Sequence, residues 1–200
     1  DQYVEGLYRV GIAEDLRLDI RGYVPPYVRF ANGTSPHAAW DKLGRRPWSR
    51  PTLPWMSIGY ETQIAPINTV TFYNAIANGG RMMRPRFVKQ FVKDGEVVLE
   101  TEPEVIREQI AKPSTIATMQ TILRHVVSQG LGKRAGSRTF PVSGKTGTAQ
   151  VAKAGGYRSG ITENWLSFCG YFPSDNPQYT CIVCIKKAGL PASGGTMSGS

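Results

Sequence analysis

The chain has 200 residues, 40% of them hydrophobic and 20% charged, with a net charge of +9 and a sequence pI of about 9.6. This length suits one domain or a large part of one. No apolar run approaches the roughly 20 residues that a membrane-spanning helix needs, and no signal peptide is visible, which leaves open how an intact protein would be anchored.

The excess positive charge is spread along the chain in short groups of arginine and lysine. Nucleic acid is one conceivable partner, but no nucleic-acid-binding motif accompanies the charge. A carboxylate-bearing polymer or an anionic membrane surface would suit it equally well. The simplest interpretation is a solvated basic surface, and we expect no nucleic-acid partner.

The first half of the chain mixes helical and irregular patterns. Apolar residues at helical spacing predict a helix over residues 2–11. Residues 21–54 are rich in Pro, Gly and Arg without a steady period, which predicts a long irregular loop. Pro66 suits the first position of a helix and Gly79 or Gly80 its end, so a well-buried helix is expected between them. Ile67, Val70, Asn74 and Ala77 repeat on one face of that helix, and Phe72, Tyr73 and Ile76 broaden its apolar stripe.

The second half of the chain predicts a hairpin, a helix and a sheet. Residues 87–100 form an expected hairpin around an Asp94-Gly95 turn. Pro113 opens a helix with a wide apolar face, and Gly130 ends it. Three strands are then expected, the last two antiparallel neighbours, at about 141–150, 164–172 and 178–187.

The segment Lys145-Thr146-Gly147-Thr148 carries the chemistry of the chain. A KTGT strand motif serves acyl-transfer enzymes that attack D-alanyl peptides or penicillins. Side chains alternate along a strand, so Lys145 and Gly147 should share one face, with Thr146 and Thr148 on the other. An ammonium and nearby hydroxyls suit a carboxylate, and the Thr148 N–H would supply half of an oxyanion hole. Without a twist or a bulge, however, the ammonium and the hydroxyls cannot all serve one site.

A phosphate-binding loop is the rival interpretation of the Gly-Lys-Thr letters. That loop needs a glycine five residues before the glycine of Gly-Lys, and Thr139 occupies this position. It also runs from a strand into a helix, which Gly147 and the small residues after it disfavour. We therefore reject nucleotide binding.

Three cysteines could suggest redox or metal chemistry. Cys181 and Cys184 form a C-x-x-C, but they lie in an expected strand, where positions i and i+3 face opposite sides. They are therefore poorly placed to pair or to share a metal, and buried free thiols are the expected state of Cys169, Cys181 and Cys184.

Several stretches of the chain carry further recognisable sequence. They are residues 53–60, 66–80, 83–85, 126–130, 144–150, 165–173 and 190–195. These stretches resemble the class B penicillin-binding proteins, which are peptidoglycan D,D-transpeptidases, and most of all their division-specific subgroup. They occur in the family's order and span nearly the whole chain.

Two departures from the family pattern matter. The family uses the serine of S-x-x-K as its nucleophile and then an S-x-N triplet, but no serine here is followed three residues later by lysine. The one S-x-N, Ser174-Asp175-Asn176, follows the KTGT segment instead of preceding it and is typical of a turn. We interpret it as a decoy. Both ends of the chain look cut, with the nucleophile-bearing part and a final helix missing.

The resemblance implies an α+β fold, an antiparallel sheet flanked by helices as in serine β-lactamases, with residues 1–200 as one partial transpeptidase domain. It implies serine acyl transfer that cross-links stem peptides and is blocked covalently by β-lactams, with no organic cofactor and no metal. Lys145, Thr146, Gly147 and Thr148 are the implied catalytic residues. Thr146 and Thr148 would bind the substrate carboxylate, and Tyr157, in a glycine-rich loop over residues 152–160, is a further substrate-binding candidate beside Arg158.

The implied partners are peptidoglycan stem peptides, β-lactams and cell-division proteins. The implied location is the periplasmic side of the bacterial inner membrane, with an anchor outside these residues. Two alternatives stay open: transfer to water, as in a D,D-carboxypeptidase or β-lactamase, and a non-catalytic penicillin-sensing domain. Without its missing parts, the isolated chain is expected to be inactive.

Overall fold

The computed structural model describes residues 2–29, 48–151, 163–189 and 192–198. It divides into two compact units. The first comprises Asp1–Asn68 and Arg84–Glu104, and the second Thr69–Met83 and Val105–Ser200. No helix in the described part of the chain is long and apolar enough to cross a membrane.

The first unit is built on short elements around a small apolar cluster. Its elements are α1 (Gln2–Arg9), β1 (Tyr27–Val28), α2 (Thr52–Ser57), β2 (Thr62–Gln63), β4 (Gln90–Lys93), β5 (Glu96–Glu100) and the start of α3. Val4, Ala13, Val28 and Met56 are buried together, and β1 pairs with β2 in an antiparallel manner. The helix expected near the N-terminus is therefore confirmed, and it ends before Gly11, whose φ is 83°.

The expected irregular loop over residues 21–54 is wrong at two places. Tyr27–Val28 form β1, and α2 begins at Thr52. The prolines of this segment disfavour a helix in general. Pro54, however, lies in the first turn of α2, where a missing N–H breaks no intrahelical hydrogen bond. The Thr52 hydroxyl accepts a hydrogen bond from the Ser49 N–H at 3.1 Å, which fixes the approach to α2.

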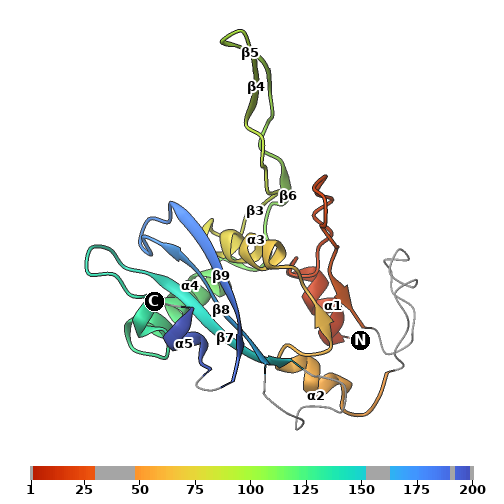
Figure 1. The fold of residues 1–200 in the computed structure, drawn as a ribbon, viewed down its shortest axis with the longest axis vertical. Helices are drawn as coiled ribbons and strands as arrows, with labels where there is room; N and C mark the ends of the chain where they lie inside the picture. The colour runs from red at the N-terminus through yellow and green to blue at the C-terminus, as the bar shows by residue number, and fades with distance from the viewer. Residues whose placement is uncertain (1, 30–47, 152–162, 190–191, 199–200) are drawn as a thin grey trace. The chain divides into compact units, whose positions relative to one another are not determined.

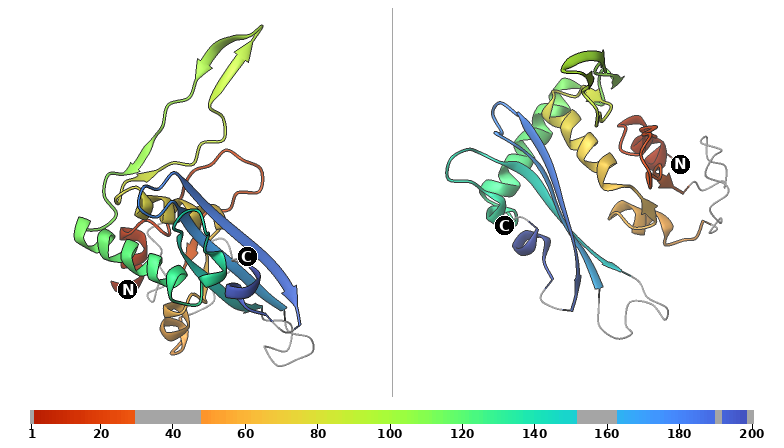
Figure 2. Two further views of the ribbon diagram at one scale, coloured as in Figure 1. Left: turned by 90° about the vertical axis from the view of Figure 1, so that its left-hand side faces the viewer. Right: turned by 45° about the horizontal axis from the view of Figure 1, so that its top comes forward.

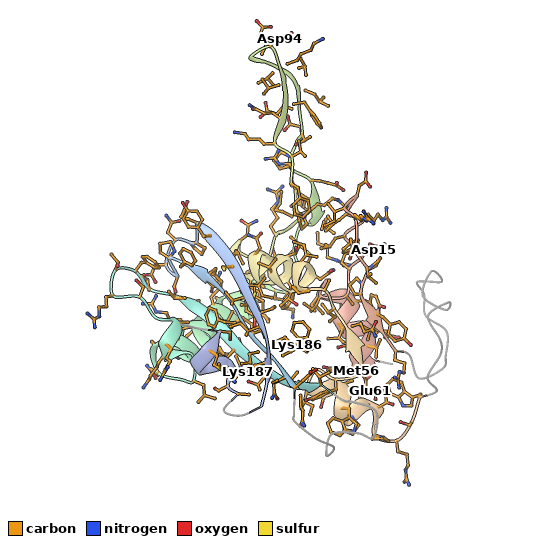
Figure 3. The ribbon with its side chains drawn as sticks, viewed as in Figure 1. Asp15, Met56, Glu61, Asp94, Lys186 and Lys187 are labelled. Carbon is orange, nitrogen blue, oxygen red and sulfur yellow. The ribbon has the colours of Figure 1, made fainter. Side chains whose placement is uncertain are left out.

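The hairpin β4–β5 is confirmed with its turn. Asp94 and Gly95 have φ values of 52° and 86°, which are the left-handed values that a two-residue hairpin turn requires. Asp94 lies at the tip of the hairpin (Figure 3). Every residue from Gln90 to Glu100 is exposed, so this hairpin is held by its own ladder and not by a core.

The second unit contains the rest of the α+β fold expected from the sequence. Its elements are the main part of α3 (Pro66–Ala77), β3 (Met82–Met83), β6 (Val105–Arg107), α4 (Pro113–Ser128), a 3-10 turn η2 (Lys133–Ala135), β7 (Ser143–Val151), β8 (Glu163–Phe172), β9 (Tyr179–Ala188) and α5 (Gly194–Met197). Strands β7, β8 and β9 form an antiparallel sheet in that order (Figure 1). The sheet is visibly twisted (Figure 2).

The main core of the second unit lies between α3, α4 and the central strand β8. Its buried members are Ala75, Ile76, Met82, Ile110, Ile116, Leu123 and Tyr171. A smaller cluster joins Val127 of α4 to Val142 and Phe168. The expected helices α3 and α4 are confirmed. The buried positions of α3 are Asn68, Thr71, Ala75 and Ile76, whereas Ile67 and Val70 are only partly buried.

Candidate active site

The KTGT segment lies in the middle of β7, an outer strand of the described sheet (Figure 1). β7 pairs with β8 from Ser143↔Tyr171 to Val151↔Glu163 without a register shift. The strand begins buried at Ser143 and Gly144 and becomes more exposed from Lys145 onward. It thus presents the motif at the surface from a firmly paired backbone.

The two faces of β7 divide the motif as the sequence predicts. Lys145 and Gly147 lie on one face, opposite Cys169 and Ser167 of β8, while Thr146 and Thr148 lie on the other. A Cβ on Gly147 would lie 2.5 Å from the Ser167 hydroxyl, so a larger residue there would require the Ser167 side chain to turn away. Because the ladder has no bulge, only the twist of the strand can turn the ammonium and the hydroxyls toward one ligand.

The side chain of Lys145 is exposed and its ammonium is only partly occupied. Its Nζ donates a hydrogen bond to the carbonyl oxygen of Thr146 at 2.8 Å. An ammonium carries three donors, so this bond does not exhaust it. Its remaining donors are open to solvent or to a further acceptor.

Thr148 is exposed, and its hydroxyl has a defined partner from a distant segment. The backbone N–H of Gly194 donates to Thr148 Oγ1 at 2.9 Å. Gly194 begins the short helix α5, which lies beside β7 (Figure 2). Gly194 lies in one of the stretches that resemble the family, but no local sequence pattern links it to Thr148.

The Ser174-Asp175-Asn176 triplet lies in the turn between β8 and β9, at the buried start of β7. Ser143 Oγ donates to Ser174 Oγ at 2.8 Å, and the Ser174 N–H donates to the Pro141 carbonyl at 2.8 Å. Asp175 forms an ion pair with Arg124 of α4 at 3.2 Å. All these contacts tie elements of the fold together, and the lack of a catalytic role for Ser174 stays a prediction.

Replacing Ser174 with alanine should cost about 1 kcal/mol of stability, because the buried Ser143 hydroxyl loses its partner. Acylation by a labelled penicillin should change by less than about twofold, as for surface substitutions away from a site. Urea unfolding and acylation time courses on the full-length protein measure the two effects. Ser137→Ala, at an exposed serine of the same unit, is the control for stability. A tenfold or greater loss of acylation in Ser174→Ala would place this serine in the catalytic set.

The cysteines are free, but the expectation that all three are buried is wrong. Cys169 is buried, whereas Cys181 and Cys184 are exposed on β9. Burial raises the pKa of the Cys169 thiol to about 12, and the nearby Cys181 and Cys184 add to the shift. Cys181 pairs with Gly170 and Cys184 with Ser167, which puts the two on opposite faces as predicted. In the described ranges, no group of three or more His, Cys, Asp or Glu side chains could hold a metal ion.

Two parts of the predicted site are not placed by the structure. Tyr157 and Arg158 lie outside the described residues. The attacking serine is not found in the sequence as an S-x-x-K, and Ser143, two residues before Lys145, is only 1% exposed. The described residues therefore place the KTGT motif on an exposed strand, and no S-x-x-K serine lies in the sequence to act with it.

Comparison with known proteins gives one consistent family. Residues 40–200 match the family model of the penicillin binding protein transpeptidase domain. Penicillin-binding protein PbpB of Mycolicibacterium smegmatis is 30% identical over 157 residues, which cover 74% of this chain and 24% of that protein. PbpB of Mycobacterium tuberculosis is 34% identical over 146 residues, which cover 69% of this chain and 21% of that protein.

Solved structures agree with the sequence comparison. Penicillin binding protein 3 of Mycobacterium tuberculosis complexed with ampicillin matches with a TM-score of 0.75 at 25% identity, covering 97% of this chain and 42% of that one. The chain spans only 24% and 21% of the two curated relatives named above. With a family model that covers most of its residues, the chain belongs to the penicillin-binding protein transpeptidase domain family.

Proposed function

We propose that the intact protein carrying this chain is a serine-type peptidoglycan D,D-transpeptidase that penicillins inhibit covalently. The observation that carries the proposal is β7, which presents Lys145 and Thr148 at the surface of a chain that belongs to the penicillin-binding transpeptidase family. One relative of known structure, penicillin binding protein 3 of Mycobacterium tuberculosis, has been crystallised with ampicillin and with aztreonam, which supports β-lactams as ligands.

The proposed reaction has two acyl-transfer steps. A serine outside residues 1–200 attacks the carbonyl carbon of the D-Ala–D-Ala bond, an acyl-enzyme ester forms, and D-alanine leaves with the proton it gains. The amine of a second stem peptide then attacks the ester, which forms the cross-linking amide and returns the proton to the serine. A β-lactam would follow the first step only, because its ring opens and its leaving group stays attached.

Each residue of the motif has a proposed role. Lys145 supplies positive potential and holds the proton network around the serine. Thr146 and Thr148 bind the terminal carboxylate of the substrate with their hydroxyls, helped by the twist of β7, and the Thr148 N–H stabilises the tetrahedral oxyanion. Gly147 lets the substrate backbone approach closely, and the substrate could add along β7 as a further strand. Tyr157 remains a candidate contact from a loop outside the described residues.

The proposed setting is peptidoglycan synthesis during cell division. A peptidoglycan D,D-transpeptidase FtsI homolog of Mesostigma viride is 29% identical over 154 residues, which supports the division-specific subgroup. Cell-division proteins are the proposed protein partners. The proposed location is the periplasmic side of the inner membrane, with an anchor outside this part of the chain. Residues 1–200 would be one partial domain of that protein.

Acylation of the full-length protein by a fluorescent penicillin tests the proposal. One stable adduct per protein is expected, and peptide mapping should place it on a serine outside residues 1–200. A stem peptide ending in D-Ala–D-Ala, supplied with an amine acceptor, should yield the cross-linked product and D-alanine. Hydrolysed product alone would indicate a carboxypeptidase, and an adduct without turnover of the peptide would indicate a sensing domain. Absence of any adduct would remove the proposal.

A further inference from the structure

The hydrogen bond between Gly194 and Thr148 joins two segments 46 residues apart at an exposed position. Its donor is the Gly194 backbone N–H and its acceptor is Thr148 Oγ1, at 2.9 Å. Thr148 remains exposed with this bond in place. The contact therefore fixes the hydroxyl of a residue that stays exposed on β7.

The close approach depends on the absence of a side chain at residue 194. A Cβ there would overlap the carbonyl oxygen of Gly147 and lie 3.1 Å from the carbonyl oxygen of Ser167. Both obstacles are backbone atoms, which cannot turn aside as a flexible side chain could. Any larger residue must therefore shift this segment relative to the strand, and with it the N–H that reaches Thr148.

The neighbouring Gly195 is equally crowded but in a different direction. A Cβ on Gly195 would overlap the carbonyl oxygen of Leu131, and it would meet no atom of β7 among its nearest contacts. The two glycines thus offer a matched pair. A substitution at either residue disturbs the same short segment, and only the one at Gly194 acts directly against the KTGT strand.

The direction of the hydrogen bond decides what the Thr148 hydroxyl does. A hydroxyl has one hydrogen to donate and two lone pairs to accept with. The Gly194 N–H occupies one lone pair, so the hydroxyl hydrogen turns away from it toward other acceptors. A hydroxyl held in this way is an oriented donor, and a charged acceptor gains about twice as much from such a donor as a neutral acceptor does.

We infer that the Gly194 N–H is a positioning group that holds the Thr148 hydroxyl as a donor and thereby selects ligands with a free carboxylate over the corresponding ester. This inference rests on the proposed function, because it assigns a specificity device to the same strand. It adds a backbone group from α5, which belongs to no catalytic motif of the sequence. Gly194 itself does not contact the ligand.

Acylation of the full-length protein by a penicillin and by its methyl ester tests the inference. The measured quantity is the ratio of the two second-order acylation rate constants, acid over ester. The wild-type protein should prefer the acid, and Gly194→Ala should lower the ratio by about tenfold, as expected for one misdirected hydrogen bond. Acylation by the ester should change much less, which also reports that the variant is folded.

Three further variants separate positioning from a general structural effect. Gly195→Ala should leave the acid-to-ester ratio at the wild-type value, even if it lowers the melting temperature. Thr148→Ser keeps the hydroxyl and should retain most of the preference for the acid. In a Thr148→Val background, Gly194→Ala should have no further effect on the ratio, because the hydroxyl that it positions is already gone.

A second variant tests the inference in case the Gly194→Ala protein does not fold. Glycolic acid incorporated in place of Gly194 exchanges the backbone N–H for an ester oxygen and adds no atoms that clash. It should lower the acid-to-ester ratio to a similar extent.

An unchanged ratio, an equal slowing of acid and ester, or an equal effect of Gly195→Ala would overturn the inference while leaving the proposed function intact. A wild-type protein that neither ligand acylates would overturn both.

Discussion

Replacing Lys145 with alanine in the full-length protein is expected to slow acylation by a fluorescent penicillin by about a hundredfold to a thousandfold, the usual cost of losing one electrostatic donor in an active site. The exposed ammonium of Lys145 makes a single described hydrogen bond, to the Thr146 carbonyl, and none to a carboxylate. Its removal should therefore cost little stability. The time course of labelling on a denaturing gel gives the rate, and a thermal melt reports the fold.

Lys187 is a matched control for this experiment. Its Nζ donates to the carbonyl of the next residue, Ala188, at 3.4 Å, just as the Nζ of Lys145 donates to the carbonyl of Thr146. Lys187 lies on β9, outside the KTGT segment (Figure 3). Lys187→Ala should therefore change the acylation rate by less than about twofold. Near-normal acylation of Lys145→Ala, or an equal loss in both variants, would refute the role proposed for Lys145.

The parts of the fold that the sequence predicts well are those specified by local signals. Pro113 at the start of α4 and Gly130 after its end mark that helix, and a 3.6-residue apolar period lies between them. Asp94 and Gly95 can adopt the positive φ that a tight hairpin turn needs, so the hairpin follows from two residues. In each case the determining interactions lie within a few residues of one another.

The parts that were missed depend on contacts between distant residues. Strand β3 pairs with β6 through only two register pairs, Met82↔Arg107 and Met83↔Val105, and neither segment is long enough to show a period. The exposure of Cys181 and Cys184 also depends on what covers β9, which an alternating apolar pattern cannot reveal. The strands themselves were predictable from the sequence, but which strand faces are covered by other elements was not.

In the candidate site too, local features were predictable from the sequence, and contacts between distant residues were not. The KTGT letters and the alternation of a strand suffice to place Lys145 and Thr148 on opposite faces, as the register confirms. The partner of Thr148 is 46 residues away, and the two serines joined at the start of β7 are 31 residues apart. A backbone donor such as the Gly194 N–H cannot be identified from the residue type, because nearly every residue has one. The only sequence signal is the glycine itself, which is the residue that fits so close to another strand.

The largest effect on stability is expected at Tyr171, the central aromatic residue of the second unit. Tyr171 is fully buried on β8 and packs in the cluster formed with α3 and α4. Tyr171→Ala should destabilise the domain by about 3–5 kcal/mol, because the lost ring leaves a cavity between two helices and a sheet. Tyr171→Phe keeps the ring, and it should change stability by less than about 1 kcal/mol, because the buried Tyr171 hydroxyl makes no hydrogen bond in the described part of the chain.

Tyr179 provides the control at the surface of the same sheet. It begins β9, is 65% exposed and stacks on Phe172 with a centroid distance of 5.5 Å. Tyr179→Ala should therefore cost about 0.5–1.5 kcal/mol, the range for an aromatic pair. The urea concentration at which the full-length protein loses penicillin labelling measures all three variants. If Tyr171→Ala shifted this midpoint no more than Tyr179→Ala, the packing of β8 against α3 and α4 could not be the main core of the unit, because a filled core cannot lose a buried ring without cost.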